Sequence, residues 1–161
     1  MFEVYSILRV LHQIAAALWL GEVLIINTIV IPVLSKYDGG LRKQLITTIF
    51  PRLFRVASIL SVTVIATGLF IVFYITSGKL EILLSGRWGL SILIGGSLGI
   101  LLTIFHFFIE DKLAKKIVNG NQGNDEKLAE VHLKIKIIPK IGLIVLLTIF
   151  LLMINAVHGI L

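Results

Sequence analysis

The sequence predicts an all-α membrane protein, an antiparallel up-down-up-down bundle of four transmembrane helices. Hydrophobic residues make up 57% of the 161 residues, too large a share for a soluble domain of this size. Four apolar runs each reach the roughly 20 residues that span a hydrocarbon core of about 30 Å. They cover Val10–Leu34, Val56–Ile75, Trp88–Ile109 and Ile141–Leu161. We therefore expect a single four-helix transmembrane domain over residues 1–161.

The distribution of basic residues predicts the orientation of this bundle. Twelve of the fifteen Lys and Arg residues fall in two segments, Ser35–Arg55 and Glu110–Lys140. Because basic loops stay on the cytoplasmic side, we expect a multi-pass protein of the cell membrane with both termini outside. Attraction to anionic lipid headgroups is a sufficient reason for the net charge of +6. The expected partner is thus the lipid bilayer, and nucleic acid is not.

Prolines and glycines set the expected helix limits. Pro32 lies near the end of the first helix, and Pro51 predicts the start of the second, because proline suits a first helical turn. The second helix should end near Thr76, and a short connection should lead to the third helix at Trp88.

The third helix should continue past the membrane to about Val118, where a glycine-containing loop follows. The fourth helix should begin at Asn124 or Asp125, either of which can cap it, and continue through Pro139.

Two histidines, His12 and His158, lie on the first and last apolar runs. At 1.5 Å per residue they stand ~33 Å and ~26 Å above the cytoplasmic edge. Two imidazoles at similar depth on neighbouring helices are what a six-coordinate haem iron takes, and Arg9 lies one turn outward, where it can pair with a propionate. The sequence therefore predicts haem b between these helices. The alternative is that both are interfacial histidines at helix ends.

The absence of cysteine narrows the redox chemistry. Without cysteine, the chain cannot form a disulfide, hold an iron–sulfur cluster by thiolates or attach haem through thioethers. With only two methionines it also lacks the soft ligands that Cu(I) prefers.

A second histidine pair, His106 and His132, lies on the cytoplasmic side. His106 stands ~5 Å inside the membrane edge and His132 ~14 Å outside it. Gly95 and Gly99 share the side of the helix that carries His106. Small residues there leave room for either a porphyrin or a closely packed helix. The cofactor prediction is therefore one haem b, or two if this pair also binds iron.

Glu22 is the single formal charge within the four apolar runs and lies near the bilayer midplane. A carboxylate at that depth is costly and is usually functional or protonated. We expect Glu22 to be a catalytic residue that relays protons or contacts a quinone headgroup. The alternative is a neutral carboxylic acid hydrogen-bonded to the second helix, at Ser61 or Thr67.

The first helix carries His12-x6-Trp19-Leu20-Gly21. This pattern resembles the first helix of copper-resistance D (CopD) type membrane proteins and of HemJ-type protoporphyrinogen oxidases. Further residues continue the likeness, namely Pro32, Arg52, Arg55, Gly68 and His106. The resemblance implies haem ligation by His12 and a site role for His106. It also makes Trp19, Arg52 and Arg55 candidate cofactor-binding residues.

These observations predict a membrane b-type haem protein that acts in electron transfer. Its redox partner would be a quinone or the other subunits of a membrane redox complex such as a respiratory assembly. One alternative is a non-haem structural subunit or a CopD-like copper-handling protein. Another is a HemJ-like protoporphyrinogen oxidase, and whether the chain is an oxidoreductase itself or a subunit of one stays open.

Overall fold

Long helices account for most of the chain in the computed structural model. It describes residues 2–37, 39–120 and 125–158, apart from the side chains of residues 2, 39, 43, 110, 111, 113–136 and 158. The elements in order are α1 (Phe2–Ile25), the π-helical turn η1 (Ile26–Val30), α2 (Ile31–Leu34), α3 (Gly39–Thr76), α4 (Glu81–Leu84), α5 (Arg87–Gly120) and α6 (Asp125–His158).

Four stretches of these helices are long and apolar enough to cross a membrane. They cover Glu3–Leu34, Gly40–Thr76, Arg87–Ile109 and Ile137–Val157. The predicted all-α class with four membrane-spanning helices is confirmed, and the chain is a multi-pass membrane protein.

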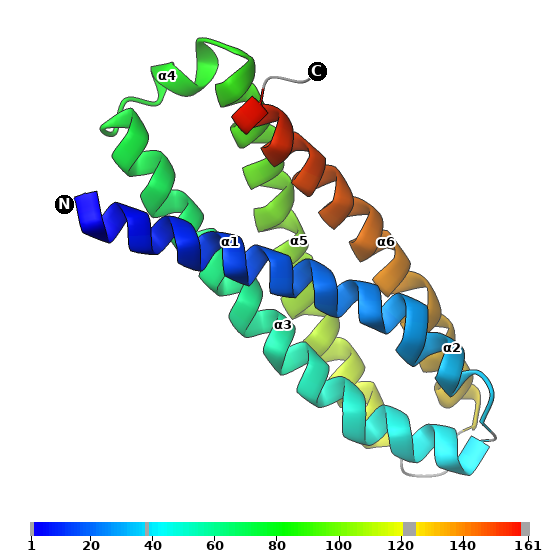
Figure 1. Cartoon of the computed structure of the whole chain (residues 1–161). Helices are drawn as coiled ribbons and strands as arrows, with labels where there is room; N and C mark the ends of the chain where they lie inside the picture. The colour runs from blue at the N-terminus through cyan, green and yellow to red at the C-terminus, as the bar shows by residue number, and fades with distance from the viewer. Residues whose placement is uncertain (1, 38, 121–124, 159–161) are drawn as a thin grey trace.

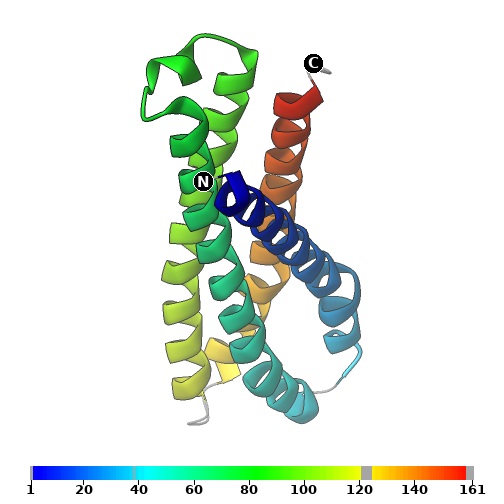
Figure 2. The ribbon, with the colours of Figure 1, turned by 60° about the vertical axis from the view of Figure 1, so that its left-hand side comes forward.

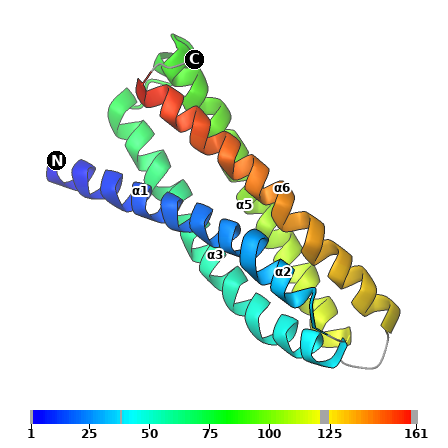
Figure 3. The ribbon, with the colours of Figure 1, turned by 45° about the vertical axis from the view of Figure 1, so that its right-hand side comes forward.

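The four long helices form a bundle that is open at one end. α2, the end of α5 and the start of α6 lie at the same end of the bundle, and α4 lies at the other end (Figure 1). Near α2, the first helical stretch lies beside α6. Towards the two termini, α1 and α6 diverge, and the views in Figures 2 and 3 agree on this. The half of the bundle near the termini, where α1 and α6 are further apart, is called the outer half below, and the half near α2 is called the inner half.

The π-helical turn η1 was not predicted, and its cause lies in the sequence. Pro32 has no backbone N–H, so it cannot donate to the carbonyl of residue 28. The helix widens just before it, and the N–H of Ile31 donates to the carbonyl of Ile26, five residues back. The side chains of Asn27 and Thr28 donate to main-chain carbonyls four residues back, at 2.8 and 2.7 Å. The side-chain donors of the widened turn are thus paired with main-chain carbonyls inside an apolar helix.

The prediction that the second helix starts near Pro51 is wrong. α3 begins at Gly39 and carries Pro51 inside it. The preceding turns are held by packing, since Ile46 and Phe50 form a buried cluster with Leu34 of α2. This burial outweighs the hydrogen bond that the proline removes.

Two clusters of buried side chains occupy the core, and both lie in the inner half and middle of the bundle. One is the Leu34 cluster, against which Ile109 of α5 and Ile138 of α6 also pack. The other joins Trp19, Ala57 and Leu146, from α1, α3 and α6. Large apolar side chains on the outer faces of all four long helices are exposed, as expected for faces that contact lipid.

The connection between α3 and α5 contains a short helix, α4, that was not expected. Gly78 turns the chain with a φ of 76°, which glycine adopts without strain. Leu83 of α4 is 2% exposed and lies directly over Gly89 of α5. A side chain at Gly89 would overlap the backbone of Leu83, so this close approach depends on glycine.

Candidate functional site

The His12 imidazole lies inside the bundle, between α1 and α3. Its Nδ1 is 3.0 Å from the carbonyl oxygen of Val64 and 3.1 Å from Oγ1 of Thr67. Gly68 lies against the ring, and a Cβ added there would be 3.1 Å from Cε1 of His12. Thr67 and Gly68 therefore form the surface of α3 that the His12 imidazole contacts.

The hydrogen bonds to α3 fix the tautomer of His12. A carbonyl oxygen only accepts, so Nδ1 must carry the proton. The single hydroxyl hydrogen of Thr67 is directed to the carbonyl of Thr63, at 2.6 Å, so Oγ1 of Thr67 is an acceptor towards His12. The neutral ring then has its lone pair on Nε2, which has no hydrogen-bond partner among the described residues. A metal-binding histidine is commonly held in this way, with its second nitrogen donating to a backbone carbonyl.

His106 contacts α3 in a similar way, one level further towards the inner half. Its Nε2 is 3.2 Å from Oγ of Ser58 and 3.4 Å from the carbonyl oxygen of Phe54. The rings of Phe54 and His106 meet edge to face, with centroids 5.8 Å apart. The Nε2 atom of His106 is thus engaged with α3 in this arrangement.

The glycines near His106 contact neighbouring helices. A Cβ on Gly95 would lie 2.7 Å from Cε of Met153 on α6, and one on Gly99 would lie 3.5 Å from Cδ1 of Ile65 on α3. The sequence left open whether these glycines make room for a porphyrin or for a closely packed helix. The contacts in the structure are those of close helix packing.

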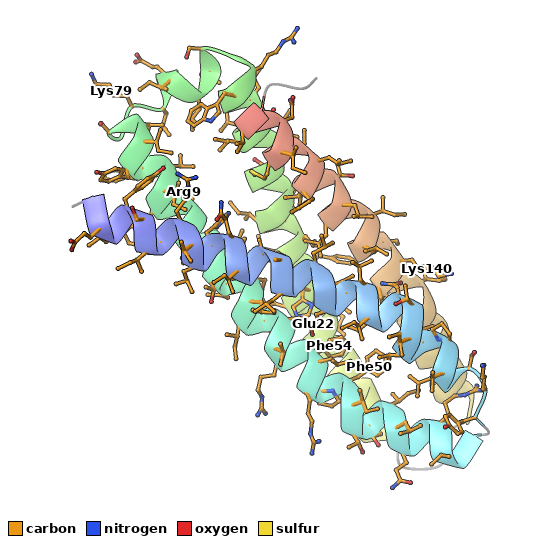
Figure 4. All side chains as sticks on the ribbon, viewed as in Figure 1. Arg9, Glu22, Phe50, Phe54, Lys79 and Lys140 are labelled. Atoms are coloured by element: carbon orange, nitrogen blue, oxygen red, sulfur yellow. The ribbon has the colours of Figure 1, made fainter. Side chains whose placement is uncertain are left out.

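The candidate cofactor-binding residues occupy three different environments. Trp19 is 4% exposed and packs in the core against Ala57. Arg52 and Arg55 are exposed on α3, away from the buried face that carries Ala57. Arg9 is also exposed, on the outer half of α1 (Figure 4). The structure therefore does not bring Trp19, Arg9 and the α3 arginines together into one site.

The remaining two histidines, His132 and His158, belong to α6, but their side chains lie outside the described residues. The His12–His158 and His106–His132 pairs therefore stay predictions. The described contacts of His12 are with α3 rather than α6.

Glu22 has no hydrogen-bond partner among the described residues, although both of its carboxyl oxygens are buried. The alternative, a hydrogen bond from Glu22 to the second membrane helix at Ser61 or Thr67, is not found among the described residues. Ser61 donates to the carbonyl of Ser58 at 3.1 Å, and the hydroxyl of Thr67 lies at His12. The hydroxyl hydrogens of Ser61 and Thr67 are thus directed to main-chain carbonyls of α3, and the carboxyl of Glu22 has no donor among the described residues.

Sequence reasoning named Thr67 and Gly68 for other reasons and missed their contact with His12. Thr67 and Gly68 are a small polar and a small apolar residue on one helix, a common signal of close helix contact in membranes. Asn27 was also missed, and its amide donates to the carbonyl of Pro139 on α6 at 2.9 Å. An amide in the middle of an apolar run was the available signal for this interhelical bond.

Within the described ranges, no three His, Cys, Asp or Glu side chains lie close enough to hold a bare metal ion. No family model matches this chain, and neither does any curated protein or solved structure. The likeness to CopD-type and HemJ-type proteins therefore rests on the motif residues alone and stays a prediction.

Proposed function

We propose that this chain is a membrane b-type haem protein in which His12 ligates the iron and that it acts in electron transfer. One observation carries the proposal. The His12 ring lies inside the bundle with Nδ1 donating to a backbone carbonyl, which leaves Nε2 as an unprotonated ligand atom. Neutral imidazole presented through Nε2 is a common protein ligand of haem iron.

The packing of the outer half is compatible with a bound macrocycle. The two buried core clusters lie at the level of Trp19 and further inward. Outward of Trp19, the buried apolar residue of α1 is the small Ala15, and α1 and α6 diverge here (Figure 3). A small residue at this level keeps the surface of α1 slim, and such a surface suits a flat, mostly apolar group.

The residues of this chain would hold the haem by two kinds of contact. His12 would bind the iron, with its ring orientation fixed by Val64 and Thr67. Arg9, one turn outward on α1, would pair with a propionate. When bound, haem b supplies a reversible one-electron carrier within the membrane, and a quinone or a partner redox subunit would exchange that electron.

The test is the visible spectrum of the purified protein together with a pyridine haemochrome assay. We expect a Soret band in the parent protein and its loss in His12→Gln, whose amide can still donate to α3 and so preserve the helix contact. His106→Gln is the matched control, because it changes the other α3-bound imidazole. It should retain the band.

A second variant, His12→Gly, tests ligation directly. Added imidazole should restore the spectrum of haem-reconstituted His12→Gly if Nε2 of His12 is the ligand. The absence of haem after reconstitution of the parent protein would overturn the proposal, as would an unchanged spectrum in His12→Gln. In either case His12 would be a helix–helix contact of a structural membrane subunit, which its two hydrogen bonds to α3 also fit.

A further inference from the structure

A second group in the bundle has no part in the proposed haem site, namely the carboxyl of Glu22. Both of its oxygens are buried, and neither meets a donor from the described residues. Buried polar groups are almost always hydrogen-bonded, so an exception needs a specific explanation.

The position of Glu22 follows from the packing of α1 on α3. Trp19 packs against Ala57, and the two helices run in opposite directions (Figure 1). Glu22 lies one turn inward of Trp19 and therefore reaches the level of Phe54 on α3. Figure 4 shows Glu22 between the ribbons of α1 and α3 in that view. Both carboxyl oxygens of Glu22 are buried, and the core cluster of Trp19, Ala57 and Leu146 one turn further outward is apolar.

The other titratable groups at this level do not neutralise Glu22. On α5, His106 turns its Nε2 to α3 rather than to the carboxyl. On α3, Arg52 and Arg55 are exposed, and on α6, Lys140 is exposed. None of these side chains donates a hydrogen bond to the carboxyl oxygens of Glu22.

An ionised carboxylate in these surroundings would be unstable. Removing a charge from water without a compensating partner costs many kcal/mol, and the group takes up a neutralising ion instead. A metal cation needs several oxygen ligands. Among the described side chains, the remaining buried oxygen without a partner belongs to Asn27, whose amide nitrogen donates to α6. A proton needs no further ligand and is the simplest occupant.

We propose that Glu22 is a proton-binding site, a carboxylic acid that holds its proton at neutral pH and exchanges it with water. The hydroxyl hydrogen has no acceptor that would lock it in place. The widened turn η1 begins four residues further along the same helix, and such turns are frequent at functional sites. Release transfers the proton to a water molecule and leaves the carboxylate, and uptake reverses that transfer. This site does not depend on haem.

Infrared spectroscopy of the detergent-solubilised full chain tests this directly. At neutral pH the parent protein should show the carbonyl stretch of a protonated carboxylic acid, and this band should shift after transfer to D₂O. Glu22→Gln should lose the band, whereas Glu81→Gln should keep it, because Glu81 is an exposed carboxylate on α4. Circular dichroism would show that both variants fold.

Three results would overturn the proposal: no such band at neutral pH, a band that persists in Glu22→Gln, or a band that does not shift in D₂O. A second measurement uses the parent protein alone. Dicyclohexylcarbodiimide, an apolar reagent, adds to protonated carboxylic acids in membranes, and the adduct mass should map to Glu22 and not to Glu81. Modification of Glu81 in place of Glu22 would also contradict the proposal.

Discussion

Replacing Gly68 with valine should displace His12 from α3. A Cβ at position 68 would lie 3.1 Å from Cε1 and 3.5 Å from Nδ1 of the His12 ring. Valine adds two methyl groups beyond that Cβ, and its χ1 angle is nearly fixed in a helix. The side chain therefore cannot turn away, and the imidazole has to leave its place between the helices.

The size of the effect can be worked out from these contacts. Overpacking a close helix contact costs about 1–3 kcal/mol, and losing the hydrogen bonds of Nδ1 costs about 0.5–1.5 kcal/mol. Valine has a better helix propensity than glycine, and this raises the free energy of unfolding by a few tenths of a kcal/mol. We expect Gly68→Val to lower the free energy of unfolding by roughly 1.5–4 kcal/mol.

The matched control is Gly96→Val on α5, where an added Cβ would meet no atom within 4 Å. That variant should change the free energy of unfolding by less than about 0.5 kcal/mol. Both are measured by titrating the detergent-solubilised protein with sodium dodecyl sulfate and following helix loss by circular dichroism. If the two valine variants have equal free energies of unfolding, the contact between His12 and Gly68 is refuted.

Three further predictions concern the rest of the fold. Asn27→Leu should lower the free energy of unfolding by about 1–2 kcal/mol, more than Thr28→Val, because the Asn27 amide links η1 to α6; similar losses in both variants would contradict this. Gly89→Ala should destabilise the chain by about 1–3 kcal/mol and speed proteolysis at α4, whose backbone its Cβ would overlap; resistance equal to the parent would argue against that contact. The chain lacks cysteine, so Gly86→Cys should react with an impermeant thiol reagent in intact cells and Gly120→Cys should not; the reverse pattern would invert the expected orientation.

The membrane spans could be predicted because hydrocarbon thickness leaves little choice for an apolar run of about 20 residues. The residues at which the helices begin and end were harder to predict. Pro51 indicated a helix start by its local preference, but Ile46 and Phe50 extend α3 by packing on Leu34. Local propensity cannot anticipate burial against a distant residue, which is why the start was placed too late.

The sequence could identify the residues of the candidate site, but it could not predict which helix each of them contacts. Depth along the membrane identified His12 and Glu22 as unusual, because it depends only on position in an apolar run. Which helix lies beside His12 depends on lateral packing, and hydropathy carries no signal for that. The ring could have been assigned to α3 only by weighing Thr67 and Gly68 as a contact surface.

The widened turn η1 also sets the rotational register of the first membrane-spanning stretch. Ile26 and Leu34 are both buried, yet eight residues of regular α-helix would rotate one about 80° away from the other. A π turn acts as one inserted residue, so the effective separation is seven residues and the offset falls to about 20°. The same side of the helix can therefore carry Trp19 in the middle of the bundle and Leu34 at its inner end. The effect of a deletion should consequently depend on its place in this stretch. Removing one residue from η1 restores a regular helix that still has Ile26 and Leu34 on one side. Adding or removing one residue elsewhere in α1 turns His12 away from α3.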